Sequence, residues 1–180
     1  MRWLVVAMWV LLVVDLTVWS PPPSPDQDAW IQAVLLGQWT GKNPATIALF
    51  SLLGLWPLAF AGRLSAELRA RPLPAWPFVL GSMVLGGFAL LPYFMLRPTP
   101  PPSRDPGRWL RWLQHPAYLP VLGLLGVAMA AWGLLAGDLR GFADAFRSEQ
   151  LIQVMSLDFI ALTILSGLTV SRAAERDRSR

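Results

Sequence analysis

Five long apolar runs alternate with shorter polar connections along the 180-residue chain. The runs cover residues 3–19, 44–62, 76–96, 117–136 and 151–170. A helix needs about 20 apolar residues to cross the hydrocarbon core of a bilayer, and each run comes close to that length. The pattern therefore predicts an all-α fold, a polytopic membrane bundle of five transmembrane helices that forms a single domain over residues 1–180.

The connections have patterns of their own. Proline-rich stretches at 20–25 and 97–103 should end the first and third helices and stay extended. Amphipathic stretches within 26–39, 105–113 and 137–149 predict short helices that lie in the interface. The charged residues 171–180 predict a flexible tail.

The run 76–96 is the most uniform, because it holds no charged residue and is framed by Trp76 and Tyr93. Aromatic rings of this kind mark the two membrane interfaces. Small residues at helical spacing let another helix approach closely, so we expect 76–96 to receive the helix at 151–170 or a partner. The predicted packing residues are Gly81, Ser82, Gly86 and Gly87, with Gly123 and Gly126 in the run 117–136.

The first run has a second interpretation. One Arg before an apolar core is also typical of a cleaved signal peptide. The run is long for such a peptide, Asp15 interrupts its end, and no small-x-small cleavage pattern follows. We therefore interpret 3–19 as a retained helix; cleavage would leave four spans, with both termini on one side.

Composition and charge refine this picture. Only 14% of the residues are charged, against roughly 25% in soluble domains, as expected for a chain in lipid. The net charge of +4 is first a topology signal, so we expect membrane lipid and no nucleic acid as a partner. With five spans, six basic residues share the side of the N-terminus and nine share the other. The positive-inside rule then places the C-terminus in the cytoplasm and the N-terminus outside.

The residue inventory excludes most catalytic machinery. The chain has no Cys and one His, and it shows no phosphate loop, zinc pattern or Ser-His-Asp set. We therefore predict no enzymatic activity, no metal and no cofactor, with a bound pigment or lipid left open.

Two carboxylates lie within the apolar runs. Asp158 should face the bundle, either as a proton or cation site or as a buried group bonded to a neighbouring helix. Asp15 lies four residues from the end of its run, so we expect it to reach water at the interface. On the five-span topology the two carboxylates lie about 6 Å and 20 Å below the same surface, too far apart for a dyad.

The segment before the fourth run supplies the other candidates. His115 could ligate a metal or a pigment magnesium, sense pH, or simply be polar at an interface. Nearby cationic and indole side chains could bind anionic lipid or merely anchor the chain in the headgroup region. These side chains are Arg108, Trp109, Arg111 and Trp112.

Three segments carry a resemblance. They are residues 43–58, with Asn43-Pro44 and Trp56-Pro57, then 74–93, and 154–159, which read Val-Met-Ser-Leu-Asp-Phe. Together they resemble a family of uncharacterised small polytopic membrane proteins from cyanobacteria and plastids. The acidic-basic run that ends the fifth helix in that family is replaced here by residues 171–176. The resemblance implies a photosynthetic membrane, and it supplies no activity and no catalytic residue.

Three functional hypotheses follow for a plasma or thylakoid membrane. The first is an accessory or assembly factor that contacts other membrane-protein subunits through its helices. The second is a small proton or ion transporter subunit that uses Asp158. The third is a pigment- or lipid-binding protein that uses His115 and the Trp-rich interface.

Overall fold

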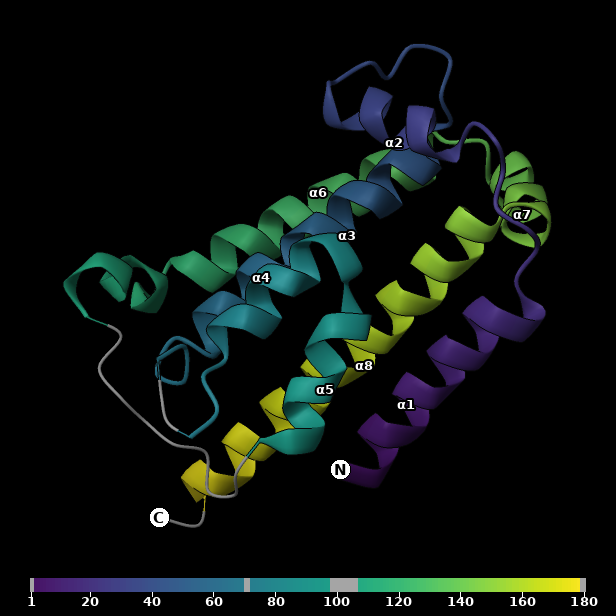
Figure 1. Ribbon diagram of the computed structural model, residues 1–180. Coiled ribbons are helices and arrows are strands. Elements are labelled where there is room, and N and C mark those ends of the chain that lie inside the picture. Colours follow the sequence, from purple (N-terminus) through teal and green to yellow (C-terminus); the bar gives the residue numbers. More distant parts are fainter. Residues whose placement is uncertain (1, 70–71, 98–106, 179–180) are drawn as a thin grey trace.

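A computed structural model of the chain describes residues 2–69, 72–97 and 107–178, and these residues form helices and connections without a strand (Figure 1). The all-α architecture is confirmed. The α-helices are α1 (Arg2–Val14), α2 (Gln27–Leu35), α3 (Pro44–Arg63), α4 (Trp76–Leu85), α5 (Gly87–Leu96), α6 (Tyr118–Ala136), α7 (Leu139–Ser148) and α8 (Gln150–Arg178). A π-helical turn η1 (Asp15–Trp19) extends α1, and a 3-10 helix η2 (Arg108–Gln114) precedes α6.

Four helices in the described part of the chain are long and apolar enough to cross a membrane. They are Arg2–Trp19, Pro44–Arg63, Tyr118–Ala136 and Gln150–Ser171, which match four of the five predicted runs. The start of α3 follows from its sequence, since the Asn43 side chain accepts a hydrogen bond from the Ala45 N–H and Pro44 opens the helix. The short amphipathic α2 and α7 both lie near one end of the bundle, apart from each other (Figure 1).

The prediction of one continuous helix over 76–96 was wrong. The backbone breaks at Gly86, where φ is 54° and ψ is −131°. The rings of Phe78 and Tyr93 have centroids 5.4 Å apart, whereas fifteen residues of continuous helix would separate them by about 22 Å. The helices α4 and α5 therefore fold back on each other, and we call residues 76–96 the α4–α5 hairpin.

The hairpin changes which connections share an end of the molecule. Each of its arms is ten residues long, or about 15 Å, roughly half the thickness of a bilayer core. The chain therefore enters and leaves the hairpin at one end, where Gln114 Nε2 donates to Ser65 Oγ at 3.4 Å. The start of α1 and the end of α8 lie at that end too (Figure 1). We call it the terminal end, and the end with α2 and α7 the opposite end.

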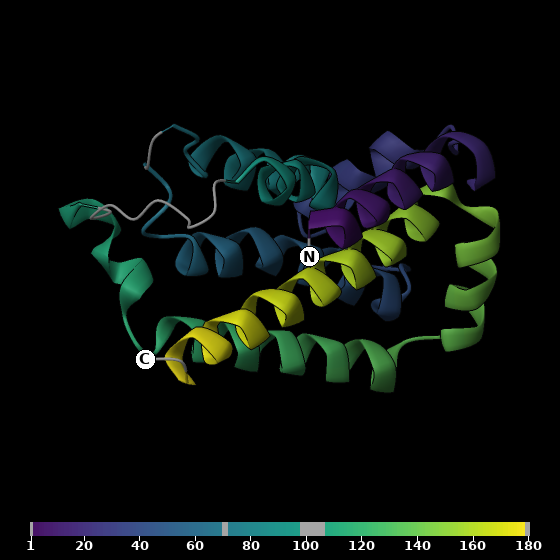
Figure 2. The same cartoon turned by 90° about the horizontal axis from the view of Figure 1, so that it is seen from below.

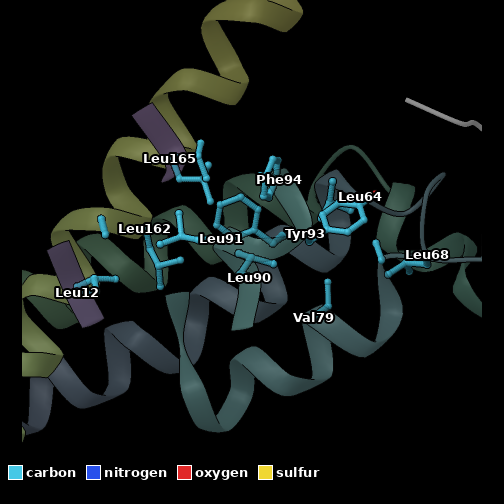
Figure 3. Close-up of a cluster of buried hydrophobic side chains, with 14 of the residues drawn as sticks. Leu12, Leu64, Leu68, Val79, Leu90, Leu91, Tyr93, Phe94, Leu162 and Leu165 are labelled. Carbon is cyan, nitrogen blue, oxygen red and sulfur yellow. The ribbon is translucent and has the colours of Figure 1, made fainter. Parts of the chain in front are cut away.

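The core surrounds α5. Its side chains Leu90, Leu91 and Tyr93 are fully buried between Leu12 of α1, Leu162 and Leu165 of α8, and residues of α3 and α4 (Figure 3). Because lipid tails are as apolar as leucine, close packing and polar contacts hold such a core more than the hydrophobic effect does. The hairpin is thus the centre of the bundle.

The helix α6 lies at the outside and packs mainly along α3 (Figure 2). A Cβ on Gly133 would overlap the Ala48 Cβ, and a Cβ on Gly126 would lie 3.7 Å from Leu52. These two glycines therefore let α6 approach α3 closely, whereas Gly123 has no neighbouring atom within 4 Å of its Cβ position.

One further boundary differs from the prediction. The helix α8 continues to Arg178, so residues 171–178 extend a helix where a tail was expected. The Ala, Glu and Arg residues of this stretch are strong helix formers, which explains the extension. At the other end of α8, Glu149 adopts an extended conformation and separates α7 from α8.

Candidate functional site

The tip of the α4–α5 hairpin is built around Asp158. This residue lies eight positions into α8, about 12 Å along the helix, and its exposed fraction is 5%. Its Oδ1 accepts a hydrogen bond of 2.8 Å from the Gly87 N–H, the first residue of α5. The first N–H groups of a helix lack intrahelical partners and carry partial positive charge, so a carboxylate is a fitting cap for them.

The two glycines at the tip leave no room for a side chain. A Cβ on Gly86 would overlap Asp158 Oδ2, and a Cβ on Gly87 would overlap Oδ1. Gly86 also has the positive φ that side chains rarely adopt. Both residues were predicted to pack against a helix, and the structure places them against the carboxylate of α8.

The other predicted packing residues of the run 76–96 lie within the hairpin. A Cβ on Gly81 would lie 3.2 Å from the Ala89 Cβ, so the missing side chain at Gly81 lets the two arms approach each other closely. Ser82 is buried, and its hydroxyl donates to the Val79 carbonyl at 2.7 Å.

The structure shows Asp158 bonded to the backbone of a neighbouring element, one of the two alternatives predicted for it. Trp9 of α1 fixes the same region, because its Nε1 donates to the Phe88 carbonyl at 3.1 Å. The hairpin tip is thus held from α8 on one side and from α1 on the other.

The expectation that Asp15 reaches water was wrong. Its exposed fraction is 6%, and its carboxylate accepts from Gln153 Nε2 at 2.9 Å and from Ser20 Oγ at 3.1 Å. The cause is the packing of η1 against the start of α8, which places Gln153 beside the carboxylate. Asp15 therefore joins the end of α1 to the start of α8.

The relative depths of the two carboxylates also differ from the five-span expectation. Since Gln153 contacts Asp15, both carboxylates lie toward the opposite end of the molecule. Asp158 lies five residues beyond Gln153, or about 7 Å further along α8. The structure does not bring Asp15 and Asp158 into contact: each has its own partners.

A second polar cluster lies at the base of the hairpin, and the sequence did not reveal it. Glu67 is buried and accepts hydrogen bonds of 2.5 Å from the Tyr93 hydroxyl and from the Arg97 guanidinium. The Arg97 guanidinium also lies 5.4 Å from the centre of the Phe94 ring. The only signal was the four-residue spacing of Tyr93 and Arg97, which places them on one face of a helix.

The interfacial candidates are dispersed around η2. His115 is exposed, and its Nδ1 accepts from the Ala117 N–H at 3.3 Å, which helps to start α6. The Trp112 ring packs edge-on against Tyr118, with centroids 5.2 Å apart. Arg111 lies exposed in η2 and has an interaction of its own. The side chains of Arg108 and Trp109 lie outside the described part of the structure.

No cluster of three or more His, Asp or Glu residues that could hold a metal ion occurs within residues 2–69, 72–97 and 107–178. His115 and the two intramembrane carboxylates therefore do not combine into one site.

No protein-family model, curated protein sequence or solved structure matches this chain. The three segments that carry the predicted resemblance lie in α3, in the hairpin and in α8, and they contact one another. Trp56 of α3 packs against Phe159 of α8 with centroids 6.2 Å apart, beside the contact of Asp158 with Gly87. The resemblance itself stays a prediction.

Proposed function

We propose that this chain is an integral membrane protein without catalytic activity, an accessory or assembly factor that binds another membrane protein through the outer face of α6. The exposure of α6 carries this proposal. Within its apolar, membrane-spanning stretch, only 6% of the α6 residues are buried in the molecule, against 39% in the corresponding stretches of α3 and of α8.

The distribution of small residues on α6 supports the same conclusion. Gly126 and Gly133 are used inside the chain, where they pack against α3. Gly123 lies in open space, with the exposed Leu119 and Val127 one turn away on either side. A partner helix could therefore approach α6 closely at Gly123, as small residues permit in membranes.

The experiment compares leucine substitutions at glycines that are equally open. Gly123→Leu fills the α6 surface, whereas Gly54→Leu on α3 and Gly167→Leu on α8 fill open space elsewhere. A pull-down in mild detergent with mass spectrometry should recover a defined partner with the wild type and with both controls. Gly123→Leu should lose that partner while it keeps the same thermal stability. Isolation of the wild type as a free monomer, or full recovery with Gly123→Leu, would contradict the proposal.

We propose further that both termini face the cytoplasm. Within the described residues, nine basic positions lie at the terminal end: Arg2, Arg63, Arg69, Arg97, Arg108, Arg111, Arg172, Arg176 and Arg178. Three lie at the opposite end: Lys42, Arg140 and Arg147. The positive-inside rule favours the richer side as the cytoplasmic one. Because the hairpin returns the chain to its starting side, this proposal replaces the N-terminus-outside orientation that five spans would give.

A second candidate function, proton or ion transport, is favoured by one observation. Asp158 lies at a glycine break in a hydrophobic segment, and such breaks beside ionisable residues mark the binding sites of many transporters. Asp158→Asn keeps an oxygen that can accept from the Gly87 N–H, so the fold should survive while the titratable group is lost. Wild-type protein in liposomes should then carry a flux that Asp158→Asn abolishes. An equal flux with both proteins would remove this candidate.

The resemblance to proteins of cyanobacteria and plastids supports a photosynthetic membrane as the location. Fractionation of the native cells tests this, because the protein should follow the thylakoid fraction in mass spectrometry. Recovery in the plasma-membrane fraction alone would contradict a thylakoid location.

A further inference from the structure

An apolar groove of about 470 Å³ opens near the terminal end of the molecule. Four helical elements form it: the second half of α3, the hairpin arm α4, the 3-10 helix η2 and the start of α6. The connection after α3 adds Leu68 and Arg69. Its floor consists of apolar side chains such as Ala61, Val79 and Leu113. The volume lies within the range of small-ligand sites, which is about 300–1,000 Å³.

The rim of the groove has a different character. Trp76 and Trp112 border it and are about half exposed. Among the described lining residues Arg69 alone is charged, and its guanidinium lies near the start of η2, 3.7 Å from a Cβ position on Gly107. Indole rings and a cationic side chain beside an apolar floor are what the headgroup boundary of a membrane favours.

Tyr118 forms one wall of the groove, and contacts within the chain fix its position. Its hydroxyl donates to the Leu58 carbonyl at 3.0 Å, and Gly62 leaves the space that its ring occupies, since a Cβ there would lie 2.6 Å from the ring. The groove is therefore preformed, and an occupant would not have to order this side of it.

We infer that this groove binds one anionic phospholipid, with an acyl chain on the apolar floor and the headgroup phosphate at Arg69. The inference is independent of the partner surface on α6. Charge complementarity selects the occupant: no carboxylate of the described chain pairs with Arg69, and Glu67, the nearest acid in sequence, is engaged by Arg97. Nine of the twelve basic positions in the described chain lie at this end. Arginine suits the role, because its planar guanidinium binds phosphate oxygens in pairs.

The test counts retained lipids by native mass spectrometry. The full chain is reconstituted in nanodiscs of equal phosphatidylglycerol and phosphatidylcholine with matched acyl chains, and then released for measurement. The wild type should retain one phosphatidylglycerol in at least tenfold preference over phosphatidylcholine. Arg69→Gln should reduce this preference to about twofold or less, whereas Arg140→Gln, at the opposite end on α7, should leave it unchanged.

Two variants that fill the groove separate acyl-chain binding from headgroup binding. Ala61→Phe from α3 and Met83→Trp from α4 should each abolish retention of both lipids, and Met83 is exposed enough that its substitution should preserve the fold. Inorganic phosphate at millimolar concentration should not displace the lipid, because it lacks an acyl chain. Equal retention of the two lipids by the wild type, unchanged retention in Arg69→Gln or Met83→Trp, displacement by phosphate alone, or a co-purified polypeptide that leaves no lipid retained would each overturn the inference.

Discussion

At the scale of single residues, Asp158 contacts Gly86 and Gly87 and accepts a hydrogen bond at the start of α5. In a soluble protein, water can accept such hydrogen bonds from the first N–H groups of a helix. A helix that begins inside hydrocarbon exposes N–H groups that nothing around it can satisfy, unless another part of the protein provides acceptors. Asp158 provides one for Gly87, and the missing side chains at Gly86 and Gly87 let the carboxylate come close. Three residues from two distant segments therefore depend on one another.

Gly86→Ala should destabilise the protein by about 3 kcal/mol, since it adds a side chain at a positive φ and in the space of the Asp158 carboxylate. Thermal unfolding in a mild detergent measures this effect as a lower Tm. Gly123→Ala is the matched control: it lies within a helix in open space, where alanine is the better helix former, so its Tm should stay the same or rise. An equal Tm for Gly86→Ala and the wild type would show that the tip is not tightly packed.

Asp158→Ala should destabilise by about 1–3 kcal/mol, because it leaves the buried Gly87 N–H without a partner. Asp158→Asn should cost much less, since its side-chain oxygen can still accept that hydrogen bond. Hydrogen exchange of the first amides of α5 reports the same difference locally. Faster exchange should appear with the alanine variant, and identical exchange in both variants would exclude a capping role for the side chain.

At the scale of elements, the α4–α5 hairpin is fixed at both of its ends. Asp158 and Trp9 hold the tip, while Glu67 binds Tyr93 and Arg97 at the base. A ten-residue helix is marginal by itself, so these contacts and the surrounding core must supply most of its stability. The base cluster also ties the connection after α3 to the last turn of α5.

Glu67→Ala should destabilise by about 3 kcal/mol, because it leaves the largely buried guanidinium of Arg97 without its counter-charge. Tyr93→Phe removes one hydrogen bond to the same carboxylate and should cost about 1 kcal/mol. Asp144→Ala breaks an exposed ion pair with Arg147 and should leave the Tm nearly unchanged. If the Tm values of Glu67→Ala and Asp144→Ala are equal, the base cluster does not hold the hairpin.

The sequence sufficed for elements whose signals are local. The boundaries of α3 follow from Asn43 and Pro44 and from a continuous apolar run, and α6 is predicted in the same way. The break at Gly86 could not be predicted, because a continuous helix and a folded-back hairpin can have the same run of apolar residues. The carboxylate that caps α5 belongs to Asp158, seventy-one positions after Gly87, and no local sequence pattern spans that separation. The burial of Asp15 was missed for the same reason, since its partner Gln153 lies on another helix.

At the scale of the whole molecule, the folded-back hairpin turns a weak charge asymmetry into a strong one. Counted over five spans, the basic residues divide six to nine, whereas the described positions divide three to nine between the opposite and terminal ends. Several acidic residues also lie at the opposite end: Asp26, Asp28, Asp138, Asp144 and Glu149. One change in backbone direction at Gly86 therefore decides which connections share an end of the molecule, because it moves everything after residue 96 relative to α1 and α3.

The chain has no cysteine, so single introduced cysteines can test this orientation without background. Pro72→Cys and His115→Cys lie on the two sides of the hairpin in sequence, and both positions are exposed. A membrane-impermeant maleimide should label both only after the cells are permeabilised, together with Ser171→Cys at the end of the α8 span. Ser24→Cys and Ser148→Cys, at the opposite end, should react in intact cells.

Five spans predict a different result, since a continuous helix over 76–96 would place residues 72 and 115 on opposite sides of the membrane. Labelling of only one of these two in intact cells would therefore show that the hairpin does not form in the membrane, and labelling of both would reverse the orientation while keeping the hairpin.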